Sequence, residues 1–270
     1  MKNRRMWILV VMVTAAVAVY GAEPVKTADE VMAFSLAKMD GYATWSADTK
    51  QTMGMKGMPL TLTGQIWFKA PRYTRTEMQM PMVGALGKMT VVLGDDKWMW
   101  QEMDIMGKKQ VVKMNMSAMA SNFSARTGQD MNFLQNANPV RSWEASRQWM
   151  NYTLLSGEPV DGQPMWVLEG TWKSGAATNA MLAGQAEAFG KLRLSIGMQD
   201  GFPHRIESFD RTQGKAVMTM EFTRIQFNPK LDDAMFHYQP PAGVQPMDIT
   251  EMSRRMFQQD DDAPAPEPKQ

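Results

Sequence analysis

Residues 60–80 read LTLTGQIWFKAPRYTRTEMQM, and this stretch decides the fold class of the chain. Apolar residues and glycine occupy every second position before the turn, and threonine, glutamine and lysine lie between most of them. Such alternation is typical of a β-strand with one apolar face. Pro71 cannot donate a hydrogen bond within a sheet, so we expect the turn at Ala70, Pro71 and Arg72. The stretch therefore predicts two antiparallel strands joined as a hairpin.

Short segments of the same kind recur along the chain and are separated by glycine, aspartate and proline. Their even spacing predicts a mostly antiparallel sheet of about eleven strands, wrapped by a few helices. The predicted strands cover residues 42–53, 60–69, 73–80, 88–93, 97–103, 108–116, 152–156, 165–172, 191–197, 203–210 and 215–227.

Helical patterns flank and interrupt these strands. Residues 27–30 read TADE, a capping box, and the apolar residues that follow predict an amphipathic helix to about Lys38. Residues 117–135 carry Met119, Phe123, Met131 and Leu134 at spacings that suit a helix. We expect Pro139 to end this helical region and Ser142 to cap a short helix that contains Trp143.

Both ends of the chain differ in composition from its middle. Lys2, Arg4 and Arg5 precede an apolar run and small residues, a pattern that predicts a signal peptide over residues 1–21 and a protein of the periplasm. Removing those three basic residues lowers the formal charge from +1 to −2 (1 − 3), which gives no electrostatic footprint for nucleic acid. The acidic and Ala/Pro-rich residues 251–270 are expected to form a disordered tail.

The chain has few residues that could perform catalysis. His204 and His237 are far apart in the sequence, and without any cysteine the chain cannot form a disulfide or a common zinc site. Ser35 and Lys38 match a Ser-x-x-Lys spelling, but neither partner motif of the serine acylases follows. No nucleophile elbow, phosphate-binding loop or dinucleotide fingerprint is present. We therefore expect neither an enzyme nor a bound cofactor.

The 29 methionines are the most unusual feature of the composition. Several alternate on strands, at residues 53–55, 78–82 and 114–116, which places their thioethers on one face. They could bind Cu(I), line a cavity that adapts to apolar ligands, or replace leucine in the core. Because methionine is spread over nearly every strand and helix, the pattern favours a lining or a core over a dedicated metal site.

Three segments together resemble the periplasmic lipoprotein carriers, the LolA/LolB-like proteins. They are GQIWFKAP at residues 64–71, VVLGDDKWMW at 91–100 and FHYQPPAGV at 236–244, in matching order and spacing. The resemblance implies an open antiparallel half-barrel over residues 22–250, with helices of a lid region, residues 117–150, on its concave face. One departure is Ala70, where the carriers often have an arginine that is thought to hold the lid closed.

The resemblance also implies a function. The expected cargo is the acyl chain of a lipoprotein or lipid on its way to the outer membrane, and expected partners are an inner-membrane export complex and an outer-membrane acceptor. Two alternatives stay open: an envelope-stress sensor that binds lipid or peptide and a regulatory membrane protein, and a Cu(I)-binding protein. The residues expected to line the cavity and its lid are Leu62, Ile66, Phe68, Met78, Met80, Val92, Met99, Met119, Phe123, Met131, Leu134 and Trp143.

Overall fold

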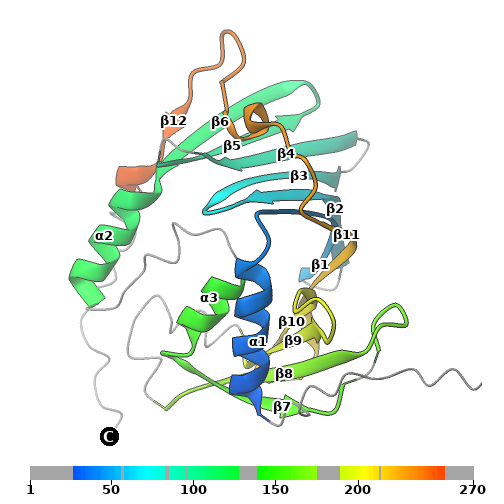
Figure 1. Ribbon diagram of the computed structural model, residues 1–270. Helices are drawn as coiled ribbons and strands as arrows, with labels where there is room; N and C mark the ends of the chain where they lie inside the picture. Colours follow the sequence, from blue (N-terminus) through cyan, green and yellow to red (C-terminus); the bar gives the residue numbers. More distant parts are fainter. Residues whose placement is uncertain are drawn as a thin grey trace, which may run out of the picture.

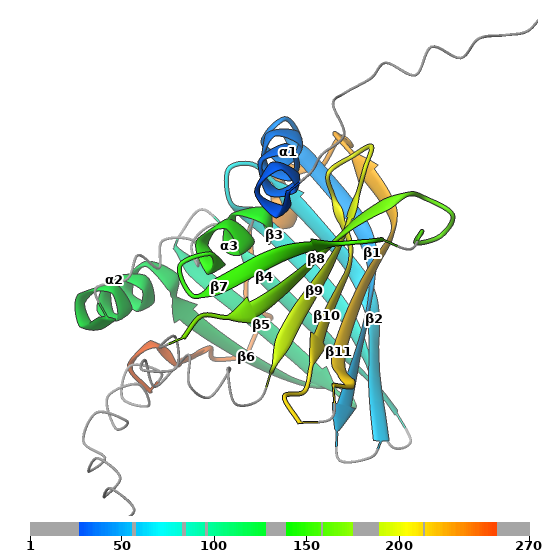
Figure 2. The same cartoon turned by 90° about the horizontal axis from the view of Figure 1, so that it is seen from below.

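A single open sheet of twelve strands organises the protein (Figure 1). The computed structural model describes residues 27–55, 58–82, 85–94, 97–127, 139–157, 159–174, 189–212 and 214–252. The strand order is β12-β6-β5-β4-β3-β2-β1-β11-β10-β9-β8-β7, and the two end strands do not pair with each other. The sheet curves around helix α1, Ala28–Asp40 (Figure 2). The predicted mostly β, open half-barrel is therefore confirmed.

The sheet consists of two antiparallel meanders, β1 to β6 and β7 to β11, which are joined where β1 pairs with β11. The short β12 was not predicted, and it runs parallel to β6, so the sheet is mixed and not purely antiparallel. The strands are β1 Thr44–Met55, β2 Met58–Lys69, β3 Tyr73–Met82, β4 Ala85–Leu93, β5 Trp98–Ile105, β6 Lys108–Asn115, β7 Met150–Leu155, β8 Met165–Trp172, β9 Lys191–Gly197, β10 Pro203–Phe209, β11 Ala216–Phe227 and β12 Met247–Asp248.

The opening stretch forms β2 and β3, as predicted. Leu62 and Phe68 are buried, whereas Thr63 and Gln65 between them are exposed. Gly64 lies where the two strands approach each other closely, since a Cβ atom there would be 1.9 Å from the carbonyl oxygen of Glu77. The alternation therefore gives β2 an apolar side, and Gly64 permits the close approach of β2 and β3.

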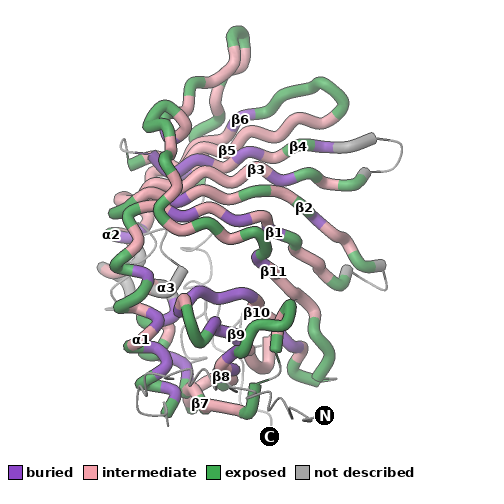
Figure 3. The backbone as a smooth tube through the Cα atoms, turned by 45° about the vertical axis from the view of Figure 1, so that its right-hand side comes forward, coloured by how far each residue is buried: buried purple, intermediate pink, exposed green. Residues whose placement is uncertain are grey.

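Helix α1 begins with the predicted capping box. Thr27 Oγ1 accepts a hydrogen bond from the Glu30 amide, and Glu30 Oε2 accepts one from the Thr27 amide. The buried side of the helix, including Val31 and Met39, packs in one cluster with Trp45. Figure 3 shows that buried residues concentrate around α1 and the strands beside it. The buried strand residues of this cluster come from β1, β2, β8, β9 and β11.

Two further helices, α2 Met116–Thr127 and α3 Pro139–Ser146, follow β6. Pro139 begins α3, where its fixed φ and missing N–H suit the first helical position. The prediction that Ser142 caps this helix is therefore wrong, because Ser142 lies inside it, and the predicted end of the preceding helical region lies outside the described residues. Helix α3 lies against α1 through ion pairs of Arg141 with Asp40 at 2.6 Å and of Arg147, in the following turn, with Asp29 at 2.7 Å.

Beyond β11 the chain crosses the face of the sheet opposite to α1 and reaches β12 (Figure 1). We call residues 229–250 the C-terminal strap; it contains the 3-10 helix η3, Asp233–Phe236. Its last residue, Thr250, is buried and accepts a hydrogen bond from the Asn115 amide at 2.9 Å.

Some predicted segments cannot be placed. The predicted signal peptide, residues 1–21, lies outside the described residues, as does the predicted tail beyond residue 252. Within the described ranges, no helix is long and apolar enough to span a lipid bilayer.

Candidate functional site

The strand register divides the sheet into two faces, because residues paired across strands point to the same side. We call the face on which α1 lies the inner face. Trp45 and Phe68 pair across β1 and β2 on this face, and their rings stack at 5.5 Å between centroids. Phe202 meets Trp45 edge to face at 5.0 Å. These rings form the part of the inner face that α1 covers.

Further along the same face, on β3 to β6, the composition changes to methionine. Among the described residues, the core cluster around α1 has no member on these four strands. Most of their inner-face side chains are half-buried, and Met78 and Leu93 are buried. We call this set the Met-rich face; it includes Thr74, Thr76, Met78, Met80, Met89, Val91, Leu93, Met99, Gln101, Met103, Gln110, Val112 and Met114.

Methionines also lie directly opposite one another within this set. Met78, Met89 and Met103 form one register row across β3, β4 and β5. Met99 pairs with Met114 across β5 and β6. At the β1–β11 border the face is extended by Met53 paired with Met218, next to Met220. The inner face thus carries thioether groups over a broad area.

The structure brings some of the predicted lining residues together. Met78, Met80 and Met99 lie on the Met-rich face, and Leu62 lies beside them, since it is the residue of β2 opposite Met80 in the register that continues from Thr63–Gln79. Met119, on α2, is half-buried.

Other predicted lining residues lie elsewhere. Phe68 and Trp143 are buried in the core cluster, and Ile66 packs against it, so these three contribute to the core. The side chain of Phe123 and the whole of Met131 and Leu134 lie outside the described part of the chain.

Val92 does not lie on the inner face, although it was among the predicted lining residues. It is fully buried, but it pairs with Arg75 and Trp100 and therefore lies on the outer face of the sheet. Val91 is the residue that faces inward, in the row of Thr76 and Gln101. The run Val91, Val92, Leu93 is apolar throughout, so its alternation does not reveal which residues face inward.

Met89, Met103 and Gln101 also belong to this face, although they were not among the predicted lining residues. Their signal in the sequence was alternation: Met89 and Val91 occupy alternate positions of one strand, as do Met99, Gln101 and Met103 of the next. Alternation shows which residues of one strand share a side. The register between strands then places Met89 and Met103 in the same row as Met78.

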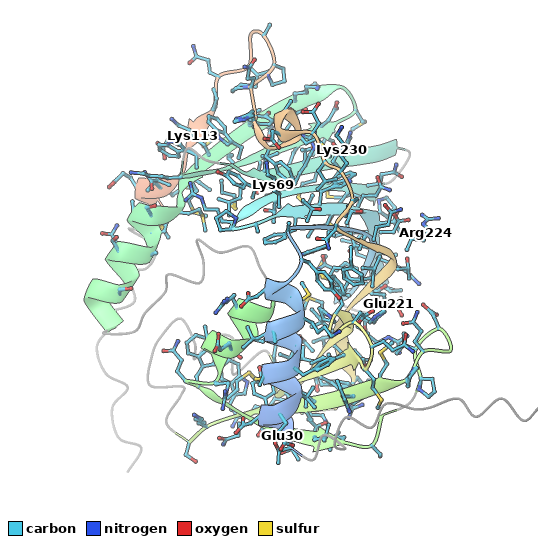
Figure 4. The ribbon with its side chains drawn as sticks, in the orientation of Figure 1. Glu30, Lys69, Lys113, Glu221, Arg224 and Lys230 are labelled. Atoms are coloured by element: carbon cyan, nitrogen blue, oxygen red, sulfur yellow. The ribbon has the colours of Figure 1, made fainter. Side chains whose placement is uncertain are left out.

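The outer face carries many charged side chains, in contrast to the inner one. Glu169 accepts hydrogen bonds from Lys191 and Arg193, both at 2.9 Å, and the bond from Lys191 contributes most to lowering the pKa of this carboxyl. Glu221 of β11 pairs with Arg205 at 2.8 Å, and Glu221 and Arg224 lie away from α1 (Figure 4). Paired charges of this kind suit a surface that faces water.

Aromatic residues of the outer face lie beneath the C-terminal strap. The rings of Trp100 and Tyr238 are 5.4 Å apart, and the Tyr238 hydroxyl donates to Glu102 Oε2 at 2.7 Å. Burial and this carboxylate raise the pKa of Tyr238. Burial raises the pKa of Glu102, but the hydrogen bonds from Lys109 and Tyr238 outweigh it, so the pKa is lowered.

A polar groove of about 770 Å³ lies on the outer face between these strands and the strap. Its lining mixes both signs of charge, with Arg75 and Lys109 beside Glu102 and Asp104. Arg75 donates to the carbonyl of Met235 at 3.1 Å and pairs with Glu77 at 2.7 Å. Arg75 therefore lies on the outer face, and Ala70 is exposed at the β2–β3 turn. Neither Arg75 nor Ala70 reaches the inner face as a latch would.

His204 lies beside one carboxylate of the described chain. Its Nε2 lies 3.0 Å from Asp200 Oδ2, because the tight turn after β9 brings residues four apart together. The same turn accepts a hydrogen bond from the buried Ser35, whose hydroxyl donates to the Gly201 carbonyl at 2.5 Å. Ser35 thus holds α1 to this turn. Within the described residues, no three His, Cys, Asp or Glu side chains gather as metal ligands would.

Solved structures with the same kind of fold include three that illustrate its range. An uncharacterized conserved protein from Thermus thermophilus is 13% identical, with 79% of this chain and 98% of that chain covered and a TM-score of 0.48. MucB of Pseudomonas aeruginosa, solved in complex with MucA, is 13% identical, with 77% and 60% covered and a TM-score of 0.42. A LolA superfamily protein from Nitrosomonas europaea is 12% identical, with 79% and 99% covered and a TM-score of 0.32.

A LolA superfamily protein is thus among the structures to which this chain is similar. At these identities the similarity concerns the fold alone. Neither a model of a known protein family nor the sequence of a curated protein matches the chain.

Proposed function

We propose that the Met-rich face binds the acyl chain of a lipid or of an acylated lipoprotein, and that the protein is a periplasmic carrier without catalytic turnover. The observation that supports this is the change in the inner face at β2. On one side of β2 the face is filled by aromatic rings and α1, and on the other it presents half-buried methionines outside the core cluster. An apolar surface of this breadth suits an apolar ligand.

Methionine suits such a ligand because its side chain is unbranched and polarizable and adapts to irregular shapes. An acyl chain of about sixteen carbons, at about 0.8 kcal/mol per buried methylene, offers on the order of 12 kcal/mol before costs. Loss of translational, rotational and chain freedom removes much of this. The remainder fits capture that is tight but reversible, as a carrier between membranes requires.

The route of the cargo follows from the same proposal. A periplasmic carrier receives its acyl cargo from an inner-membrane export complex and delivers it to an outer-membrane acceptor. The predicted signal peptide and the sequence resemblance to lipoprotein carriers support this route. The departure at Ala70 implies that closure over the cargo does not depend on an arginine at that turn.

Acyl binding is tested by titrating the purified protein with a fluorescent fatty acid. Met103→Glu places a carboxylate on the Met-rich face, and we expect it to weaken binding by about tenfold or more, because the charge must be desolvated by the acyl chain. Met106→Glu is the matched control, since Met106 lies in the turn after β5 and is 73% exposed. Equal binding by wild type and both variants, or no uptake by wild type, would contradict the proposal.

A second candidate, Cu(I) binding, is favoured by one specific observation. Met78, Met89 and Met103 lie opposite one another on neighbouring strands, and thioether sulfur prefers Cu(I) to harder ions. Titration with Cu(I) under reducing conditions tests it. If Met89→Leu leaves Cu(I) binding unchanged, this row is not a copper site.

A further inference from the structure

Polar side chains lie on the inner face at several positions, and three of them have mainly apolar neighbours in the register. Gln101 of β5 lies between Val91 and Val112 in its register row. Gln51 of β1 lies between Leu62 and Met220. Thr49 lies two residues before Gln51 on the same side of β1. Each is surrounded in the register mainly by apolar residues, where an amide or hydroxyl group is costly unless it is hydrogen-bonded.

Their hydrogen bonds within the described structure are weak or missing. Gln101 Nε2 donates to the sulfur of Met89 at 3.4 Å, and Gln51 Nε2 donates to the sulfur of Met218 at 3.5 Å. Thioether sulfur is a weak acceptor. The hydroxyl of Thr49, a residue only 6% exposed, has no partner among the described residues.

A glutamine amide has two N–H donors and a carbonyl acceptor, so a single bond to sulfur leaves most of its capacity unused. A ligand oxygen would be a much better acceptor than sulfur for the same N–H groups. The two glutamines lie on β1 and β5, at separate points of the inner face. They can therefore contact different polar groups of one ligand, or polar groups of different ligands.

We propose that Gln101 and Gln51 donate hydrogen bonds to ester or amide carbonyl oxygens of the acyl ligand. This rests on the proposed acyl binding and narrows its ligand class to acyl esters and amides. A hydrocarbon or an alkyl ether of the same length fills the same methionine surface but offers no carbonyl. The glutamines thus select for the linkage at the head of the acyl chain, and the methionines accept the chain itself.

A pair of ligands that differ only in this linkage provides the test. The 1-palmitoyl ester and the 1-O-hexadecyl ether of lysophosphatidylcholine are compared, below their critical micelle concentrations, as competitors of a bound fluorescent fatty acid. We expect wild type to prefer the ester by about fivefold, which corresponds to one net hydrogen bond. We expect Gln51→Leu/Gln101→Leu to lose this preference and to bind the ether at least as well as wild type.

Gln79→Leu is the matched control, since Gln79 is exposed on the outer face of β3 and should leave the preference unchanged. Equal affinities of wild type for ester and ether would overturn the carbonyl proposal while acyl binding stands. Retention of the preference in the double variant would overturn it as well. Failure of both competitors and of the fluorescent probe to bind would overturn acyl binding together with it. The wild-type comparison requires no variant, so the proposal stays testable if the double variant does not fold.

Discussion

Replacement of Gly64 by alanine tests whether the close approach of β2 and β3 is essential to the fold. A Cβ on residue 64 would lie 1.9 Å from the carbonyl oxygen of Glu77 and 2.8 Å from the Cα of Met78. Non-bonded carbon atoms pack at about 3.5 Å, so the two strands must separate by more than about 1 Å. Overpacking of this kind costs about 1 to 3 kcal/mol, and each strained ladder hydrogen bond adds about 1 kcal/mol. We expect Gly64→Ala to lower the free energy of unfolding by about 3 kcal/mol or more.

Urea denaturation followed by circular dichroism measures this loss, and the expected fall in Tm is about 10 °C for a domain of this size. Gly54→Ala is the control on the neighbouring strand, because the nearest atom to its Cβ would be 3.7 Å away, an ordinary contact. We expect that change to be neutral or to stabilise the fold by about 0.5 kcal/mol. If the two variants unfold at the same urea concentration as wild type, the close approach of β2 and β3 does not exclude a side chain at residue 64.

Three further outcomes follow from the two faces of the sheet. Because the hydrogen bond from Lys191 lowers the pKa of Glu169 below its ordinary value of 4.5, the folded state keeps this carboxylate ionised where the unfolded chain takes up a proton. The stability it contributes is present above pH 4.5 and is lost as the pH falls, so wild type should lose stability more steeply in acid than Glu169→Gln; parallel pH profiles of the unfolding free energy would contradict this. Tyr238→Phe removes the 2.7 Å bond to Glu102 and should lower the free energy of unfolding by about 1.5 kcal/mol in urea denaturation without changing acyl affinity, since both residues lie on the outer face. Mild peroxide should oxidise the exposed Met106 before the methionines of the Met-rich face, and acyl binding should decline only when the latter are oxidised. Peptide mass spectrometry combined with a binding assay measures both, and loss of binding after oxidation of Met106 alone would contradict this.

The opening hairpin and the start of α1 could be predicted because their signals are local. Alternation placed Leu62 and Phe68 on one side of β2, and the capping box placed the first turn of α1 at Thr27. Each signal reflects physics within a few residues: the period of a strand and the unsatisfied amides of a helix end. The turn at Pro71 is predictable for the same reason.

Residues whose roles depend on distant segments could not be placed from the sequence. Val92 and Trp100 lie on the outer face. The ring of Tyr238 in the C-terminal strap lies 5.4 Å from that of Trp100, although Tyr238 comes more than a hundred residues later in the chain. No local pattern indicates that the strap crosses there. Trp143 likewise lies in the core because α3 docks on α1, which depends on tertiary packing.

The difference between the two halves of the inner face explains why methionine is used where it is. Around α1 the inner face is filled by rings with fixed geometry, such as Trp45 against Phe68 and Phe202, and such a core suits one arrangement only. On β3 to β6 the strap covers the outer face, and under the proposed function the inner face is where apolar surface meets a changing occupant. Flexible thioethers can repack around that occupant, whereas branched residues would hold a single shape. Hydrophobic replacement of the methionine row by isoleucine should therefore preserve folding but narrow the range of acyl lengths that bind.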